Sequence, residues 1–213
     1  VAYLVGHKEF FSLKFNVTRD TLIPRPDTEE AIQVILDLVK NGQVAPQRIL
    51  DIGTGSGILA ITLAKELPEA QFVATDLSEK ALEVARSNSQ LHDVSNRIEF
   101  RQGDLLEPVR DEQYDLIVSN PPYVSDAEFE QCSRDVKEYE PHSALVSGPT
   151  GMEIYQRLVP TVADSLMPNG WLVLETSPML AESLCMLLSQ NDFENVQIQP
   201  DFAGNPRIVY GQR

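Results

Sequence analysis

The sequence has few residues that bind metals or form disulfides. Its 213 residues include two cysteines, Cys132 and Cys185, and three histidines, all isolated from one another along the chain. A structural zinc site needs several such ligands at close, paired spacings. We therefore expect two ordinary thiols in a reducing compartment and no metal site.

Basic residues are also scarce, and no long apolar run is present. Lys and Arg number 17 against 32 Asp and Glu, which gives a formal net charge of −15. Because nucleic-acid binding depends on clustered Lys and Arg, this charge argues against direct contact with DNA or RNA. No apolar stretch approaches the roughly 18 residues of a membrane span, and the first residues lack a signal-peptide pattern. We expect a cytoplasmic monomer with no membrane partner.

What the sequence does contain is a regular alternation of strands and helices. Hydrophobic residues make up 42% of the chain, and its length suits one α/β domain. Strands are predicted at 49–52, 72–75, 98–100, 116–118, 171–174, 196–198 and 207–210. Helices are predicted at 58–67, 78–90, 152–166 and 180–188. This order predicts an α/β fold with a seven-stranded, mostly parallel sheet covered on both faces.

The N-terminal segment has a different pattern. Residues 10–17 alternate and are rich in aromatics, residues 18–20 have turn chemistry, and residues 21–23 form a second extended run. We expect residues 1–26 to form a β-hairpin segment packed on a catalytic domain of residues 27–213. A helix is predicted to begin near Asp27 and end before Asn41, and residues 125–150 are expected to be a long irregular insertion.

A glycine-rich loop follows the first strand of the alternating region, with the sequence Asp51-Ile52-Gly53-Thr54-Gly55-Ser56-Gly57. Glycines allow a sharp turn and close approach to a ligand, and the next helix offers free N–H groups. A Walker loop would need Lys and then Ser or Thr after the last glycine, and a dinucleotide fingerprint would need G-x-G-x-x-G. The shorter G-x-G-x-G spacing, opened by an acidic residue, is the form used for S-adenosylmethionine.

Acidic residues at the ends of the next two strands complete the predicted cofactor site. Asp76, followed by Leu77, lies about 20 residues beyond the first glycine, where a carboxylate can accept both ribose hydroxyl hydrogens. Asp104 follows the third strand and can accept from the adenine amine, while Leu105 can cover the ring. Because ligands bind at the carboxyl ends of parallel strands, the three segments predict one adenosine-binding site.

The fourth strand ends in Asn120-Pro121-Pro122-Tyr123. A planar –NH2 group is a poor nucleophile, because its lone pair is delocalised. The Asn120 side-chain oxygen and the Pro121 carbonyl can accept its two N–H bonds and turn the lone pair toward a methyl donor. The prolines hold this backbone rigid, and Tyr123 can stack on the flat substrate. The methyl donor is already activated, so positioning is the main requirement and no acid–base residue is assigned.

The chain resembles the bacterial protein-(glutamine) methyltransferases that modify peptide-chain release factors at the glutamine of their Gly-Gly-Gln loop. The matching segments are residues 3–6, 9–10, 22–29 (LIPRPDTE), 51–57, 120–123, 140–141, 148–151 and 201–207. The resemblance implies a Rossmann-like class I S-adenosylmethionine-dependent methyltransferase. It implies that Asn120 also contacts the cofactor, that residues 120–123 hold the substrate glutamine, and that Phe10 and the Pro24-Arg25 stretch wall the pocket.

Two features depart from the family pattern. We expect a form without the small helical N-terminal domain that usually helps to grip the release factor. Glu175-Thr176-Ser177 stands where the family usually has Glu-Ile-Gly, and Ser177 is expected to alter a loop near the pocket rather than the chemistry.

Three alternative functions remain open at this point. A ribosomal-protein glutamine methyltransferase would have a similar sequence but would typically depart from the Pro26 to Glu29 pattern. A nucleic-acid amine methyltransferase shares the Asn-Pro-Pro-Tyr motif but predicts a basic groove. A non-catalytic adenosine-binding module would not need an intact motif of this kind.

Overall fold

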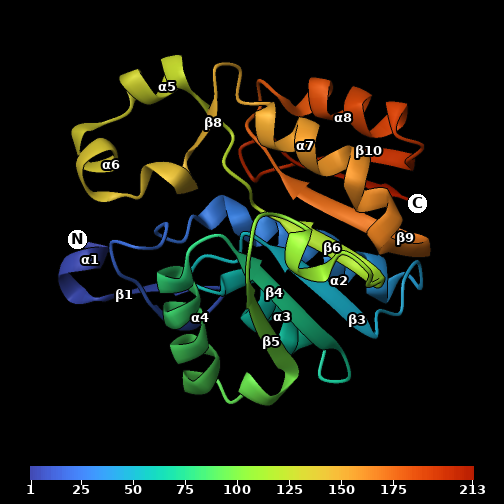
Figure 1. Ribbon diagram of the computed structural model, residues 1–213, viewed down its shortest axis with the longest axis horizontal. Coiled ribbons are helices and arrows are strands. Elements are labelled where there is room, and N and C mark those ends of the chain that lie inside the picture. The colour runs from blue at the N-terminus through green and yellow to red at the C-terminus, as the bar shows by residue number, and fades with distance from the viewer.

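A seven-stranded sheet forms the centre of the computed structural model, which describes all residues from 1 to 213 (Figure 1). The strand order is β10-β11-β9-β6-β3-β4-β5. The five strands from β9 to β5 in this order run parallel, and β11 pairs antiparallel with both β9 and β10. The bounds are β3 Arg48–Ile52, β4 Gln71–Asp76, β5 Ile98–Gln102, β6 Tyr114–Ser119, β9 Leu166–Glu175, β10 Glu194–Pro200 and β11 Pro206–Gln212. The predicted seven-stranded, mostly parallel sheet is confirmed.

Helices cover both faces of this sheet because alternate strand residues point in opposite directions. In β3, Ile49 packs with α2 and α3, whereas Leu50 packs with α7 and α8 on the other face. Figure 1 shows α7 and α8 on the side of the sheet opposite α2 and α3. The bounds are α2 Glu29–Lys40, α3 Ile58–Glu66, α4 Glu79–Leu91, α7 Glu153–Val162 and α8 Ala181–Gln190. None of the helices combines the length and apolarity needed to cross a membrane.

The N-terminal hairpin is present, but its predicted turn is wrong. After a short helix α1 (Ala2–Val5), β1 (His7–Phe10) pairs antiparallel with β2 (Leu13–Asn16). The turn is Phe11-Ser12, with φ of 47° and 60°, and not residues 18–20. Phe10 and Phe15 are both buried in the core of the catalytic region, so packing fixes a turn that carries no Asn-Gly signal.

The insertion between β6 and α7 is more regular than the sequence pattern indicated. It contains β7 (Val124–Ser125), α5 (Asp126–Gln131), α6 (Arg134–Tyr139) and β8 (Val146–Gly148). Ser125 and Glu128 form a reciprocal capping box at the start of α5. This cap stabilises a helix too short to show a clear apolar period, which explains why the prediction of an irregular segment was wrong.

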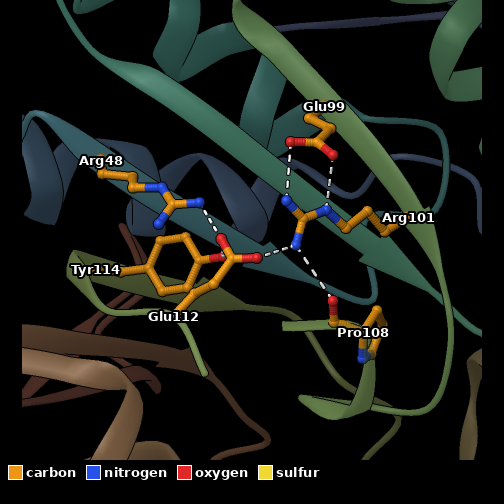
Figure 2. Close-up of polar contacts among 6 residues, drawn as sticks. All are labelled: Arg48, Glu99, Arg101, Pro108, Glu112 and Tyr114. Carbon is orange, nitrogen blue, oxygen red and sulfur yellow. Dashed lines mark hydrogen bonds and ion pairs between the residues drawn. The ribbon is translucent and has the colours of Figure 1, made fainter. Parts of the chain in front are cut away.

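A cluster of ion pairs ties β3, β5 and the start of β6 together (Figure 2). Arg101 forms two hydrogen bonds of 2.9 Å with the Glu99 carboxylate and also pairs with Glu112. Arg48 pairs with the same Glu112 and lies over the Tyr114 ring, 4.8 Å from its centroid. Hydrogen bonds from Arg101 are the largest cause of the lowered pKa of both carboxyls.

Candidate active site at the carboxyl ends of the strands

The two motifs singled out in the sequence follow neighbouring strands. The chain runs outward from β3 through β4 and β5 in one direction, and through β6 and β9 in the other. This reversal point is where ligands bind in open α/β sheets. Ile52 and Ser119 pair across β3 and β6, and the Ser119 hydroxyl donates to the Ile52 carbonyl at 2.7 Å. The glycine loop and Asn120 therefore begin side by side.

Both motifs line one cavity of about 470 Å³, a volume typical of small-molecule sites. Its walls come from residues 19–25, Thr28, residues 52–56, 58–59, 75–78, 81, 103–105, 119–122, 141, 143–144 and 154. The Pro24-Arg25 stretch is among them. Arg25 is held by Glu140, the residue directly after α6 in the insertion, with an N–O distance of 2.6 Å. This ion pair joins two segments that are far apart in sequence and that line the same cavity.

The glycine loop leaves open space on its cavity side. Gly55 has a φ of 56°, and a Cβ at this position would meet no atom within 4 Å, so the cavity beside it is free for a ligand. Gly57 differs, because a Cβ there would lie 2.7 Å from Ile61 Cδ1. Gly57 does not line the cavity, and a Cβ there would also lie 3.2 Å from the Cβ of Ala85 in α4, so the glycine lets α3 and α4 pack closely.

Asp51 shapes the loop from beneath. It is fully buried, and its Oδ2 accepts from the Thr54 hydroxyl at 2.6 Å and from the Ala60 N–H at 3.2 Å. Burial raises the pKa of this carboxyl to about 7. Asp51 does not line the cavity, so in this structure it holds the loop rather than facing a ligand.

Asp76 and its neighbours line the cavity as the strand positions predicted. Its two carboxyl oxygens accept from the N–H groups of Gly55 and Ser78, both at 2.8 Å. Burial raises the pKa of Asp76, and these backbone hydrogen bonds oppose the shift. Leu77, 65% exposed, lies at the rim. The bonds fix the carboxylate where it can accept from a further donor.

Asp104 and Leu105 complete this wall. Asp104 forms an ion pair with Arg157 of α7, a partner that the sequence pattern did not predict. Leu105 has a φ of 49°, an unusual backbone conformation for a residue with a branched side chain. Both residues line the cavity, beside the glycine loop.

The Asn-Pro-Pro-Tyr motif divides between the cavity and the interior. Asn120, Pro121 and Pro122 line the cavity, and the Asn120 side-chain N–H donates to Thr28 Oγ1 at 3.3 Å. Tyr123 does not line it; its hydroxyl donates to Glu175 Oε1 at 3.2 Å. This bond fixes the position of the hydroxyl, and stacking of the ring on the substrate stays a prediction.

Phe10, expected to wall the pocket, also lies elsewhere. Its side chain is 2% exposed and packs edge-to-face against Phe15, at a centroid distance of 6.2 Å. It is not among the residues that line the cavity. Packing in the core occupies Phe10, and the N-terminal residues that line the cavity are 19–25 and Thr28.

The sequence pattern did not single out three polar residues near Asn120 and Tyr123. Thr28, Glu175 and Arg207 come from the start of α2, the end of β9 and β11. Glu175 is 1% exposed, and the Arg207 guanidinium pairs with Asp27 at 3.1 Å. The signal available was an acidic residue directly after the apolar run 171–174, the same signal that identified Asp76. Ser177 does not line the cavity.

Known proteins match this chain over nearly its full length. The family model described as "Methyltransferase small domain" matches residues 27–136. A release factor glutamine methyltransferase of Koribacter versatilis is 41% identical over 99% of this chain and 74% of its own length. One from Rhodopirellula baltica is 40% identical over 100% of this chain and 73% of its own length. The chain belongs to the release factor glutamine methyltransferase family.

Solved structures agree on the fold of this family member. The hMettl16 catalytic domain, in complex with a MAT2A 3′UTR hairpin, superimposes with a TM-score of 0.73 over 94% of this chain and 76% of that one. Its sequence identity is 18%, so the likeness concerns the fold alone. The fold is that of class I S-adenosylmethionine-dependent methyltransferases, and the family and fold together imply an enzyme that uses S-adenosylmethionine.

Proposed function

We propose that the protein transfers a methyl group from S-adenosylmethionine to the side-chain amide nitrogen of the glutamine in the Gly-Gly-Gln motif of a peptide-chain release factor. The observation that carries the proposal is that the glycine loop and Asn120 open into one cavity from adjacent strands. The names of the relatives supply the acceptor. Because the release factor acts in translation, we place the reaction in the cytoplasm, with the enzyme as a monomer.

The cavity walls fit the proposed cofactor. The free space beside Gly55 allows close approach of a nucleoside, and the Asp76 carboxylate, already oriented by two N–H groups, can accept from ribose hydroxyls. Leu105 offers an apolar surface for the adenine ring, with the Asp104 carboxylate beside it. When bound, S-adenosylmethionine would supply a methyl group from a positively charged sulfur and would leave as S-adenosylhomocysteine.

Asn120 and Pro121 are assigned to the acceptor. The Asn120 side-chain oxygen and the Pro121 backbone carbonyl would each accept one N–H of the substrate amide. These two bonds would fix the nitrogen and favour a pyramidal form. When two reactants are held in line on the enzyme, most of the entropy cost of bringing them together has been met before the reaction begins. The methylated nitrogen is cationic and acidic, so the protein does not need a strong base, and none is assigned.

The charge of the cavity favours a protein acceptor over a nucleic acid. Among the lining residues only Arg19 and Arg25 are basic. Arg25 pairs with Glu140, and the Arg19 guanidinium lies 5.2 Å from the centroid of the Tyr139 ring. Neither forms part of a basic groove of the kind that phosphate backbones require. This observation weighs against the nucleic-acid alternative.

Methyl transfer from labelled S-adenosylmethionine tests the proposal. The enzyme is incubated with a release factor, with the same factor carrying Ala in place of the Gly-Gly-Gln glutamine, with ribosomal proteins, and with total RNA. We expect label on the unaltered release factor and on none of the others. Label on RNA alone, or equal label on the glutamine-free factor, would reject the proposed acceptor.

A further inference from the structure

A second cavity, of about 320 Å³, lies directly beside the cavity that holds the glycine loop and Asn120. Asp104 and Leu105 line both cavities, and no other residue does so. The rest of the second cavity is lined by the segment after β5, by α7 and by the turn that follows α7. Asp104 and Leu105 therefore separate the wall assigned to adenine from a space that the proposed function does not use.

The backbone of this partition is fixed, whereas the Asp104 side chain has a single partner. The Asp104 carbonyl accepts from the Glu107 N–H at 2.9 Å. The Leu105 carbonyl accepts from the Thr75 hydroxyl at 3.3 Å. Arg157 of α7 donates to Asp104 Oδ2, and no other group of the protein hydrogen-bonds to this carboxylate. The orientation of the Asp104 side chain therefore depends on Arg157.

Arg157 reaches Asp104 from the side of the second cavity. It lines that cavity and does not line the first one. Because the guanidinium binds Oδ2, the other carboxylate oxygen of Asp104, Oδ1, is left free to accept a hydrogen bond. The Arg157 and Asp104 side chains are 54% and 36% exposed, and ion pairs with this exposure contribute little to stability. The main consequence of the pair is thus the position that it gives to Asp104.

We propose that Arg157 is a positioning residue that holds the Asp104 carboxylate between the two cavities and makes the cofactor site selective for an unsubstituted adenine amine. The inference deepens the proposed function and rests on it, because it takes Asp104 as the acceptor of the amine and Leu105 as the surface under the ring. In that arrangement the amine points toward the partition. A substituent on the amine would have to displace Asp104 to enter the second cavity.

Without Arg157, this barrier is lost. The Asp104 side chain, already 36% exposed, would have no partner in the protein and could rotate toward solvent. The two cavities would then join beside the amine. An unsubstituted adenine would lose one oriented acceptor, whereas a substituted adenine would gain the space that it needs. Selectivity between the two ligands should therefore change more than affinity for the natural one.

Calorimetric titration with two ligands measures this selectivity without turnover: S-adenosylhomocysteine, and its derivative with a benzyl group on the adenine amine. The wild type should bind the benzyl derivative about 10- to 150-fold more weakly, the cost of displacing one hydrogen bond to a charged group. Arg157→Ala should bind the two ligands within about threefold of each other. Its dissociation constant for S-adenosylhomocysteine should rise by less than about tenfold, the effect of one hydrogen bond of ordinary strength.

Three further variants separate the ion pair from the bulk of the side chain. Arg157→Lys keeps a cation that can pair with Asp104 and should retain most of the selectivity. Arg157→Met keeps most of the bulk without the charge and should behave like Arg157→Ala. Arg110→Ala is the matched control, because Arg110 lines the same cavity but pairs with Glu107, at 3.8 Å, instead of Asp104. This control should keep the wild-type selectivity.

Several results would overturn the inference. They are equal binding of the two ligands by the wild type, wild-type selectivity in Arg157→Ala or Arg157→Met, and a loss of selectivity in Arg110→Ala as large as in Arg157→Ala. Should Arg157→Ala fail to fold, the Lys and Met variants at the same position decide the question. A wild type that binds neither ligand rejects the proposed function as well. A wild type that binds S-adenosylhomocysteine and labels the release factor, with unaltered selectivity in the Arg157 variants, rejects the inference alone.

Discussion

Carboxylates in two regions of this molecule have opposite electrostatic environments. In the cluster of Figure 2, Glu99 and Glu112 are bound by arginines, and their pKa values are lowered. At the carboxyl ends of the strands, Asp51, Asp76 and Glu175 are bound by hydroxyls and backbone N–H groups, and burial raises their pKa values. No arginine or lysine hydrogen-bonds to any of these three.

The two kinds of carboxylate have different roles: those in Figure 2 stabilise the fold, and those at the strand ends orient the site. A carboxylate paired with arginine uses its acceptor capacity on a cation and contributes stability. A buried carboxylate without such a pair is costly to ionise, yet it imposes a direction on every hydrogen bond it accepts. Arg48 and Arg101, which form the ion pairs of Figure 2, do not line the cavity that holds the glycine loop and Asn120.

The largest expected effect is that of Asn120→Ala. Removing the group that holds the acceptor should lower kcat by about 10²–10³-fold, the usual cost of losing one oriented hydrogen-bonding group at a reaction centre. The midpoint of thermal unfolding should change little, because Asn120 lies on the cavity wall. A kinetic assay alongside calorimetry measures both. Unchanged turnover would contradict the role of Asn120 in holding the substrate.

Asp76→Ala should act on cofactor affinity. Loss of an ionised acceptor for hydroxyl groups costs about 1.5–3 kcal/mol, or roughly 10- to 150-fold in the dissociation constant. Titration calorimetry with S-adenosylmethionine gives this value directly. Glu112→Gln, in the ion-pair cluster, is the control and should leave the dissociation constant unchanged. Equal affinities for wild type and Asp76→Ala would remove the ribose contact from the proposal.

The smallest effects are on stability, and here the two regions should differ in sign. The folded-state pKa of Glu175 is raised from 4.5 to about 7, so the folded protein holds a proton that the unfolded chain releases. Its contribution is fully favourable below about pH 4.5 and is lost as the pH rises toward 7, by up to about 3 kcal/mol. Glu175→Gln should therefore gain stability relative to wild type over this range.

Glu112→Gln should behave in the opposite way. The folded-state pKa of Glu112 is lowered, so its ion pairs stabilise the protein above the unfolded-state value, and the benefit is lost as the pH falls through the folded-state pKa. Because the side chain is 26% exposed, we expect a loss of only about 1 kcal/mol near neutral pH. Denaturant unfolding of both variants from pH 4 to 8 measures the slopes. Parallel slopes would show that the two regions do not differ.

Local patterns in the sequence were sufficient to predict the strands of the sheet and the loops at its edge. The apolar runs located all seven strands of the sheet, and the spacing of Gly53, Gly55 and Gly57 located the loop that opens into the cavity. The turn at residues 11–12 was not predictable in this way, since Phe11 and Ser12 carry no preference for a positive φ. Tertiary packing of Phe10 and Phe15 decides it.

Contacts between distant segments account for the other differences. Thr28 reads as an ordinary residue near a helix start, and nothing local indicates that Asn120, from a strand more than ninety positions away, will hydrogen-bond to it. The same holds for Asp104 and Arg157 and for Arg25 and Glu140. Such pairs are fixed by the order of strands in the sheet, which periodicity does not reveal.

The placement of β11 has a consequence for the time at which the enzyme can first act. Ile208 of β11 pairs with Glu175, and the Arg207 carbonyl accepts from the Thr176 N–H at 2.8 Å. The ribosome synthesises β11 after every other strand of this sheet. A nascent chain that already displays the glycine loop and Asn120 therefore still lacks the strand that pairs with β9 beside Glu175, so the folded form of the enzyme is complete only when nearly all of residues 1–213 have emerged.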